Sequence, residues 1–165
     1  MAYFRYFNTI GYDVRGEKNN SRINVVTNIL QRVRLKLKFI EKNVFFTQHF
    51  VIDGQTPESL AYEFYGDTEL HWVIMYSQMI TNPYYDWPLK YFDLQKYVAK
   101  KYTNINEIHH YEDSDGYEVD FDAPGAISIT NSLYEEIRND KLRNINVIKP
   151  QNVGFIVKEF KGLLK

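Results

Sequence analysis

The 165-residue sequence contains no cysteine, which excludes disulfide frameworks, thiolate zinc sites and thiol nucleophiles. It also lacks an excess of one charge, with 20 Lys and Arg against 21 Asp and Glu, unlike a dedicated nucleic-acid binder or a polybasic membrane-surface protein. No apolar run reaches the roughly 18 residues of a membrane-spanning helix. The opening Met1–Arg5 shows no signal-peptide core. We therefore expect a protein made in the cytoplasm that binds neither nucleic acid nor membrane.

Motifs that carry chemistry are also scarce. The sequence has no Gly-x-Ser-x-Gly, no P-loop and no Gly-x-Gly-x-x-Gly. His109 and His110 offer nitrogen donors, but neighbouring residues of a regular strand point to opposite faces, so we do not expect them to chelate one ion. The run Asp113-x-Asp115-Gly116 places its glycine two residues too early for a calcium loop. We expect no enzyme activity, no metal or other cofactor and no small-molecule substrate.

Aromatic residues are abundant instead. The chain has 14 Tyr, 11 Phe and 2 Trp, which together make 16% of its residues. Its length predicts one domain with or without arms, too small to hide all these rings. Tyr and Trp have a polar tip and are enriched in interface hot spots. Two interpretations stay open: an unusually Tyr-rich core, or a surface that partners largely cover.

The first half of the chain predicts an arm, strands and a helix pair. Residues 1–13 carry five aromatic residues without a helical period, so we expect an extended arm that docks on its own domain or on a neighbour. Alternating apolar residues predict strands over 32–39, where a helix also fits, and over 46–52. Thr56 as N-cap and Pro57 at the first position predict a helix that Gly66 ends, and a second short helix follows over 70–79.

The second half predicts further mixed structure. The residue patterns favour a helix over 93–102, a hairpin around 113–116, a short strand near Ile127 and Ile129, an extended segment over 144–149 and an amphipathic helix over 151–164. Ser132 and Glu135 match a capping box for a helix near 133–140. The sequence therefore predicts an α+β fold.

The stretch from Val51 to Pro83 resembles the LysM module. It combines the Asp53-Gly54-Gln55-Thr56 turn, a helix carrying Leu60-Ala61, the Tyr65-Gly66 stop, a second helix and Asn82-Pro83. The resemblance implies a LysM-like βααβ centre with an extended N-terminal arm and a C-terminal strand and helix extension. We accordingly expect three segments: the arm and strands over 1–50, the LysM-like module over 51–92 and an α+β extension over 93–165.

The motifs together are similar to a narrower family. Gly54-x-Thr56-Pro57-Glu58, Tyr65-Gly66-Asp67, His71-Trp72-Val73-Ile74 and Asp86-Trp87-Pro88-Leu89, with the aromatic opening and the 141–150 segment, resemble the baseplate wedge protein 53 family of contractile-tailed bacteriophages. The resemblance implies a structural part of the virion tail baseplate that joins adjacent wedges into the ring around the tail hub. Its partners would be other wedge and tail proteins.

The LysM likeness leaves an alternative function, binding of peptidoglycan or chitin. In LysM modules the glycan site uses two loops, here Gly54–Thr56 and Ile80–Asn82. For the wedge function we predict aromatic partner-binding residues from the arm, the turn after the second helix and the terminal helix: Tyr3, Phe4, Tyr6, Phe7, Tyr12, Tyr84, Tyr85, Trp87, Phe155 and Phe160.

Overall fold

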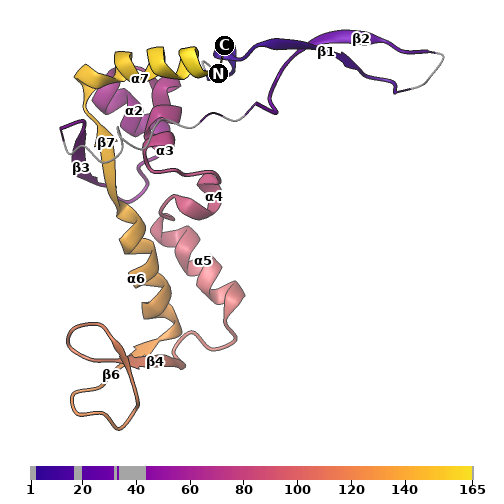
Figure 1. Cartoon of the computed structure of the whole chain (residues 1–165). Helices are drawn as coiled ribbons and strands as arrows, with labels where there is room; N and C mark the ends of the chain where they lie inside the picture. The colour runs from indigo at the N-terminus through magenta and orange to yellow at the C-terminus, as the bar shows by residue number, and fades with distance from the viewer. Residues whose placement is uncertain (1–2, 17–19, 32, 34–43, 165) are drawn as a thin grey trace. The chain divides into compact units, whose positions relative to one another are not determined.

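The computed structural model describes residues 3–16, 20–31, 33 and 44–164 (Figure 1). The chain forms two compact units, which are described separately. Unit 1 comprises residues 1–47, 56–79 and 146–165, and unit 2 comprises residues 48–55 and 80–145. Both combine helices and strands, as an α+β fold requires. The three segments expected from the sequence, 1–50, 51–92 and 93–165, have boundaries that differ from those of the two units. This division into three segments stays a prediction.

Unit 1 holds the helix pair that the sequence predicts. Helix α2 (Pro57–Tyr65) starts at Thr56, whose hydroxyl accepts the Ser59 N–H, while the Ser59 hydroxyl accepts the Thr56 N–H. The helix ends at Gly66, where φ of 70° suits a residue without Cβ. The 3-10 turn η2 (Thr68–Leu70) and helix α3 (His71–Ser77) follow. The predicted caps of α2 are confirmed.

The core of unit 1 forms where α3 and the C-terminal helix α7 (Pro150–Leu163) meet the N-terminal segment. Apolar residues of α7 recur at helical spacing, and its buried face carries Val153, Ile156 and Phe160. Residues Tyr3–Tyr6 form the 3-10 turn η1, and Phe7 is buried in the same core. The expected extended conformation is therefore wrong for residues 3–6, which form a 3-10 turn. Of the two expected docking sites for residues 3–7, the structure shows the chain's own domain.

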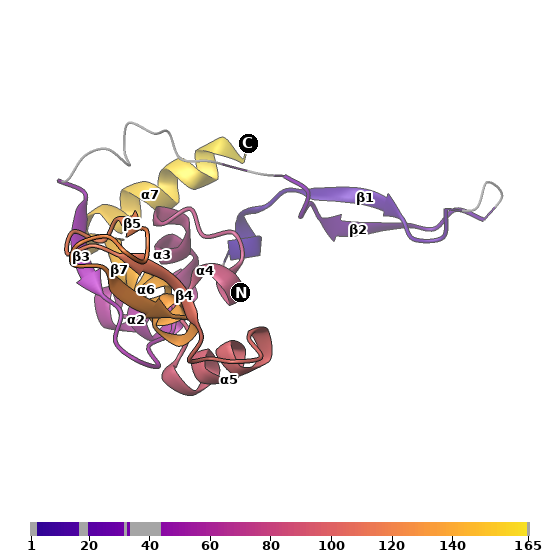
Figure 2. The ribbon, with the colours of Figure 1, turned by 90° about the horizontal axis from the view of Figure 1, so that it is seen from below.

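A hairpin follows this turn. Strand β1 (Thr9–Asp13) pairs antiparallel with β2 (Ile23–Thr27) in a separate two-stranded sheet, seen as a long ribbon in Figures 1 and 2. Eight of the ten strand residues are exposed. The base of the hairpin is tied to the end of α7, because the Asn8 side-chain amide donates to the Leu164 carbonyl at 2.6 Å.

A second two-stranded sheet consists of β3 (Phe46–Phe50) and β7 (Asn144–Ile148), whose residues are divided between the two units. The Lys149 N–H donates to the Phe45 carbonyl and the Val51 N–H donates to the Arg143 carbonyl, so the strands are antiparallel. In chain order, β3 comes before α2 and α3, and β7 follows after residues 78–143. Pro150 ends the predicted extended segment and also starts α7.

Unit 2 consists of three helices and a three-stranded sheet. A short helix, α4 (Pro83–Asp86), precedes α5 (Tyr91–Lys101), which packs beside α6 (Asn131–Arg143) (Figure 1). The sheet places β4 (Ile108–Glu112) between β5 (Glu118–Val119) and β6 (Ile127–Thr130). Its buried apolar side chains include Leu94 and Val98 of α5 and Ile129 of β6, together with Val51 after β3 and Ile145 of β7.

The structure changes the expected start of one helix. The α6 helix starts earlier than predicted, because the Thr130 hydroxyl, and not that of Ser132, accepts the Leu133 N–H as N-cap. The predicted capping box is therefore wrong, and Glu135 has another role.

The alternating run 32–39 lies, except for Val33, outside the described residues. Among the helices that the structure describes, none has the length and apolar character needed to cross a membrane.

Candidate interaction surfaces

Several predicted anchors lie inside unit 1. The rings of Tyr3, Tyr6, Phe7, Trp72 and Phe160 form one cluster, which we call the aromatic core. Within it the Trp72 and Phe160 ring centroids are 4.8 Å apart, and those of Tyr3 and Phe160 are 5.3 Å apart. Phe160 is fully buried and Phe7 is 7% exposed. These two residues hold the chain's own fold together, so they are not available to a partner.

Trp87 is likewise internal, in unit 2. Its ring is 8% exposed, and its indole N–H donates to the Gln55 carbonyl at 2.9 Å. The aromatic turn that the sequence indicates therefore has one buried ring, which packs against the 53–55 turn. Trp87 therefore offers little surface to a partner.

The neighbouring tyrosines are open to solvent. Tyr84 is 84% exposed and Tyr85 is 78% exposed on α4, and Tyr91 and Phe92 at the start of α5 are exposed as well. We call these four residues the 84–92 aromatic segment. Tyr91 and Phe92 were not predicted, because the expected helix started at Asp93. With Leu94 and Val98 buried, the helical period places Phe92 on the outer face.

Other predicted anchors are open in unit 1. Tyr12 on β1 is 58% exposed, whereas Phe4 and Phe155 are roughly half exposed. Tyr3 and Tyr6 are half-buried, and the Lys161 ammonium lies 4.5 Å from the centre of the Tyr6 ring. Of the ten predicted residues, Tyr12, Tyr84 and Tyr85 present the most surface to a partner.

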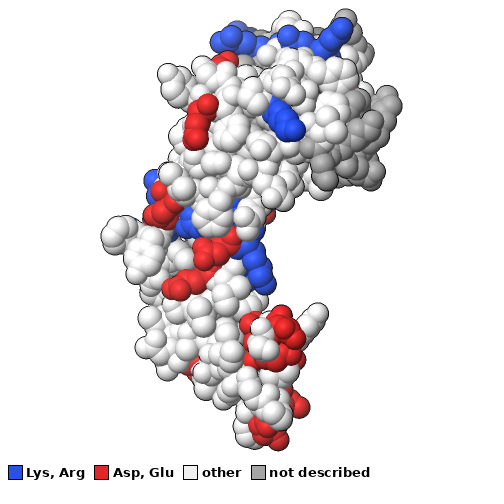
Figure 3. Space-filling view, turned by 90° about the vertical axis from the view of Figure 1, so that its left-hand side faces the viewer, with Lys and Arg blue, Asp and Glu red and all other residues white. Residues whose placement is uncertain are grey.

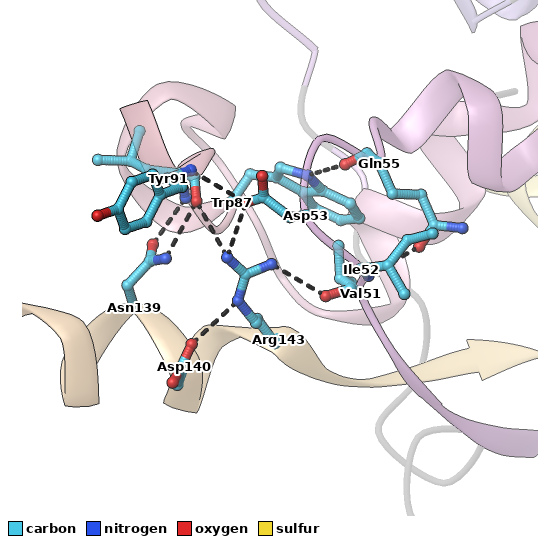
Figure 4. Close-up of polar contacts among 10 residues, drawn as sticks. Val51, Ile52, Asp53, Gln55, Trp87, Tyr91, Asn139, Asp140 and Arg143 are labelled. Atoms are coloured by element: carbon cyan, nitrogen blue, oxygen red, sulfur yellow. Dashed lines mark hydrogen bonds and ion pairs between the residues drawn. The ribbon is translucent and has the colours of Figure 1, made fainter. Parts of the chain in front are cut away.

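One arginine, Arg143, contacts both Val51 and Asp53 at the start of the 51–55 segment (Figure 4). The Arg143 guanidinium donates to the carbonyls of Val51 and Leu89 at 3.1 and 3.3 Å, and it pairs with the carboxylates of Asp53 and Asp140 at 3.2 and 3.0 Å. Its side chain is only 11% exposed. A planar group with five donors suits several acceptors at once. Arg143 therefore joins the 51–53 turn and Leu89 to the end of α6.

Two further residues complete this network. The Asn139 side-chain amide bonds both backbone groups of Leu89, at 2.7 Å to its N–H and 3.0 Å to its carbonyl. The Asp53 carboxylate also accepts the Tyr91 N–H at 3.0 Å. The backbone at Leu89 and Tyr91, within the 84–92 aromatic segment, is thus fixed, which lowers the entropy that its rings lose on binding. Sequence reasoning missed Arg143 and Asn139, because no local pattern marks them.

A buried carboxylate links α5 to α6. Glu135 accepts hydrogen bonds from the Lys101 ammonium at 2.5 Å and the Tyr102 hydroxyl at 2.9 Å, and Arg138 lies 3.6 Å away. Burial by itself raises the pKa of the Glu135 carboxyl, but these hydrogen bonds and the two cations outweigh it and lower the pKa. The same bond to Glu135 raises the pKa of Lys101. This ion pair is structural.

The two neighbouring histidines do share one side of their strand. A bulge shifts the β4–β6 register between Ile108 and His110, and the Nδ1 atoms of His109 and His110 come to 2.8 Å. His110 Nε2 also contacts the Glu112 carboxylate at 2.9 Å, and the His109 ring stacks on Tyr134. The opposite-face expectation is therefore wrong. Within the residues described, however, no group of three or more His, Asp or Glu side chains could hold a metal ion.

Acidic residues gather at the end of unit 2 that carries the β4–β6 sheet (Figure 3). The unit contains 13 acidic and seven basic residues, for a net charge of −6. The acidic residues of this end are Glu112, Asp113, Asp115, Glu118, Asp120 and Asp122. A surface of this sign repels anionic partners and attracts basic ones.

Comparison with known proteins identifies the family. A sequence model described as base plate wedge protein 53 matches residues 2–123. Baseplate wedge protein gp53 of Enterobacteria phage T4 is 24% identical over 102 residues, which are 62% of this chain and 52% of that protein. The chain thus spans about half the length of this curated relative. Because the family match covers well over half of the chain, the chain belongs to the base plate wedge protein 53 family.

Proposed function

We propose that this chain is a structural component of a phage tail baseplate wedge that joins adjacent wedges into the ring around the tail hub. The family match over residues 2–123 is the observation that carries the proposal. The chain would act in the virion through contacts with other wedge and tail proteins. These contacts require no bond-making chemistry, cofactor or small-molecule substrate.

The exposed aromatic residues support a role in protein–protein contacts. Tyr84 and Tyr85 each present more than three quarters of their surface to solvent, and the Arg143 network fixes the backbone nearby. Tyrosine is enriched in interface hot spots because it buries a large area with few rotatable bonds. We propose the 84–92 aromatic segment as one surface that a neighbouring wedge protein covers.

The test uses a phage in which the gene for this chain is interrupted. The full chain, supplied from a plasmid, should restore complete baseplates, which electron microscopy and infectious titre measure. Tyr84→Ala with Tyr85→Ala should lower the titre at least tenfold, while the matched variant Tyr62→Ala, an exposed tyrosine on α2, should restore it fully. Cross-links from the 84–92 aromatic segment to wedge proteins should appear in purified tails. If the wild-type chain is absent from tails, the proposed function is wrong.

One observation favours a second candidate function, LysM-type glycan binding. The order β3, α2, α3, β7, with β3 antiparallel to β7, supports the LysM likeness. Against a sugar site, the Trp87 indole donates a hydrogen bond to the Gln55 carbonyl, within one of the two predicted glycan loops. Titration of the chain with chitin oligosaccharides and peptidoglycan fragments separates the functions. Saturable micromolar binding would favour the glycan role, and its absence would leave the wedge role.

A further inference from the structure

The β1–β2 hairpin is an incomplete sheet. Ile23 is 72% exposed and Val25 is 77% exposed, and Ile10 and Tyr12 are exposed as well. Ile23 and Val25 lie on one face of the hairpin, and Ile10 and Tyr12 lie on the other, because successive residues of a strand alternate. An isolated two-stranded hairpin is at best marginally stable in water. Both faces of this hairpin therefore have apolar surface to bury.

The register shows which backbone groups face outward. The Asn28 N–H donates to the Asn8 carbonyl, and the Val14 N–H donates to the Arg22 carbonyl, so the pairs 8–28 and 14–22 are hydrogen-bonded. Bonded and non-bonded pairs alternate along an antiparallel ladder. Ile23 and Val25 fall at non-bonded pairs, opposite Asp13 and Gly11. Their N–H and C=O groups therefore point away from β1, toward the outer edge of β2.

This edge lacks the features that normally prevent strand addition. Natural edge strands carry a lysine, a proline, an inward charge or a bulge. The β2 sequence Ile23-Asn24-Val25-Val26-Thr27 has no charged residue and no proline, and its pairing with β1 runs without a register shift. Four of its five residues are β-branched, which favours strand pairing. The edge of β1 is less suited, because it contains Gly11 and Asp13.

Positive charge near the tip of the hairpin indicates which charge a partner strand should carry. Arg15 and Arg22 are exposed beside the tip. Their backbone N–H groups donate to the Asp13 carboxylate at 3.1 and 3.0 Å, and these bonds hold the pKa of Asp13 below its usual value. The Asp13 carboxylate is thus already hydrogen-bonded within the hairpin. A strand that pairs along β2 would meet a neutral, apolar edge and then Arg22, which directly precedes β2.

We infer that the outer edge of β2 receives a strand from another baseplate protein. That strand is rich in β-branched residues and is uncharged except for an acidic residue next to the hairpin tip. The inference rests on the proposed function and specifies how one contact is made. Backbone bonds to Ile23 and Val25 give the affinity, and their side chains, with the acidic residue at the tip, give the specificity. The added strand turns the hairpin into a three-stranded sheet.

The test removes one backbone N–H that points away from β1. Val25→Pro deletes an N–H that does not bond to β1, so the hairpin itself is retained. Thr9→Pro is the matched control, because it removes an outward N–H from the opposite edge. Purified full-length chains are added to baseplate subassemblies from infections that lack this protein, and their incorporation is measured by sedimentation. Val25→Pro should reduce incorporation at least tenfold, and Thr9→Pro should change it less than twofold.

Hydrogen exchange on the wild-type chain gives a second result that needs no variant. The amides of Ile23 and Val25 should exchange at least tenfold more slowly after incorporation. Fast exchange in the assembled particle, or normal incorporation of Val25→Pro, would overturn strand addition and leave the wedge function intact. If the wild-type chain itself does not incorporate, the proposed function fails and this inference fails with it. A dimer of the purified chain that Val25→Pro dissociates would identify a second copy as the occupant, against our inference.

Discussion

Residues 3–7 and strand β1 are close together in the sequence and both carry large apolar side chains, yet they have opposite environments. The first segment carries four aromatic residues and packs into unit 1, where Phe7 is buried. The second carries Ile10 and Tyr12 and stays exposed. The two differ in what lies opposite them. The 3–7 segment faces Trp72 and Phe160, whereas β1 has β2 as its paired strand.

This difference shows that the apolar character of a segment does not by itself tell whether its side chains are buried in the core or exposed at the surface. Burial of an aromatic ring stabilises the fold by roughly 25 cal/mol for each Å² removed from water, but only where a complementary surface exists. For residues 3–7 the chain supplies that surface through α3 and α7. The residues of β1 and β2 stay exposed in the described part of the chain, and we propose that another protein covers them. Variants of matched aromatic residues can test this division.

The largest effect is expected at the centre of the aromatic core. Phe160→Ala should lower the free energy of unfolding by about 3–5 kcal/mol, because it leaves a cavity among Trp72, Tyr3 and Tyr76. Phe155→Ala on the same helix, where the ring is half exposed, should lower it by less than about 1 kcal/mol. Chemical denaturation measures both values. Equal losses would mean that α7 does not bury the face described.

A smaller loss is expected for the N-terminal segment. Phe7→Ala should lower the free energy of unfolding by about 2–3 kcal/mol, because the ring is buried at the margin of the core. Phe4→Ala, three residues earlier and more exposed, should cost about 1 kcal/mol or less. If Phe7→Ala leaves thermal unfolding unchanged but abolishes baseplate assembly, residues 3–7 serve a partner and the contrast with β1 disappears.

The buried carboxylate of unit 2 should have a still smaller, pH-dependent effect. Glu135→Gln should cost about 1–2 kcal/mol at neutral pH, a value reduced because Lys101 is partly exposed. The folded-state pKa of Glu135 is depressed, so its stabilisation is complete above the ordinary value of 4.5. The difference between wild type and variant should shrink as pH falls below that value.

Denaturation at a series of pH values between 3 and 7 measures this difference. Glu118→Gln, an exposed acidic residue of the same unit, is the control and should change stability little at any of these pH values. A Glu135→Gln effect that stays constant down to pH 3 would contradict the lowered pKa.

Features set by nearby residues could be predicted from the sequence. The N-cap of α2 at Thr56 and its end at Gly66 depend on side chains within one turn of the helix, so the motif was sufficient. The same holds for the apolar face of α7 and for the β4–β5 hairpin around Gly116, which has φ of 82°. The cap of α6 was assigned two residues too late, since Thr130 and Ser132 are equally good caps by residue type.

Features that join distant parts of the chain could not be predicted. Whether Phe7 is buried depends on Phe160, and Arg143 contacts a carbonyl 92 residues earlier in the chain. Neither pairing leaves a local pattern. The side-by-side position of His109 and His110 depends on a bulge relative to β6, which strand alternation does not indicate. For the candidate surfaces, residue type selects aromatic rings, but only packing separates the buried Trp87 from the exposed Tyr84.

The smallest effect on stability is expected at Tyr12. Its effect on assembly therefore tests whether β1, unlike residues 3–7, contacts a partner. The ring is 58% exposed on the hairpin, so Tyr12→Ala should change the free energy of unfolding by no more than about 0.5 kcal/mol. Incorporation into baseplate subassemblies should nevertheless fall several-fold, because a partner covers that ring. Tyr12→Phe should retain most of the incorporation, since it keeps the apolar ring. A loss of more than about 1 kcal/mol in unfolding would place Tyr12 with Phe7 as an internal residue, and unchanged incorporation would remove it from the contact surface.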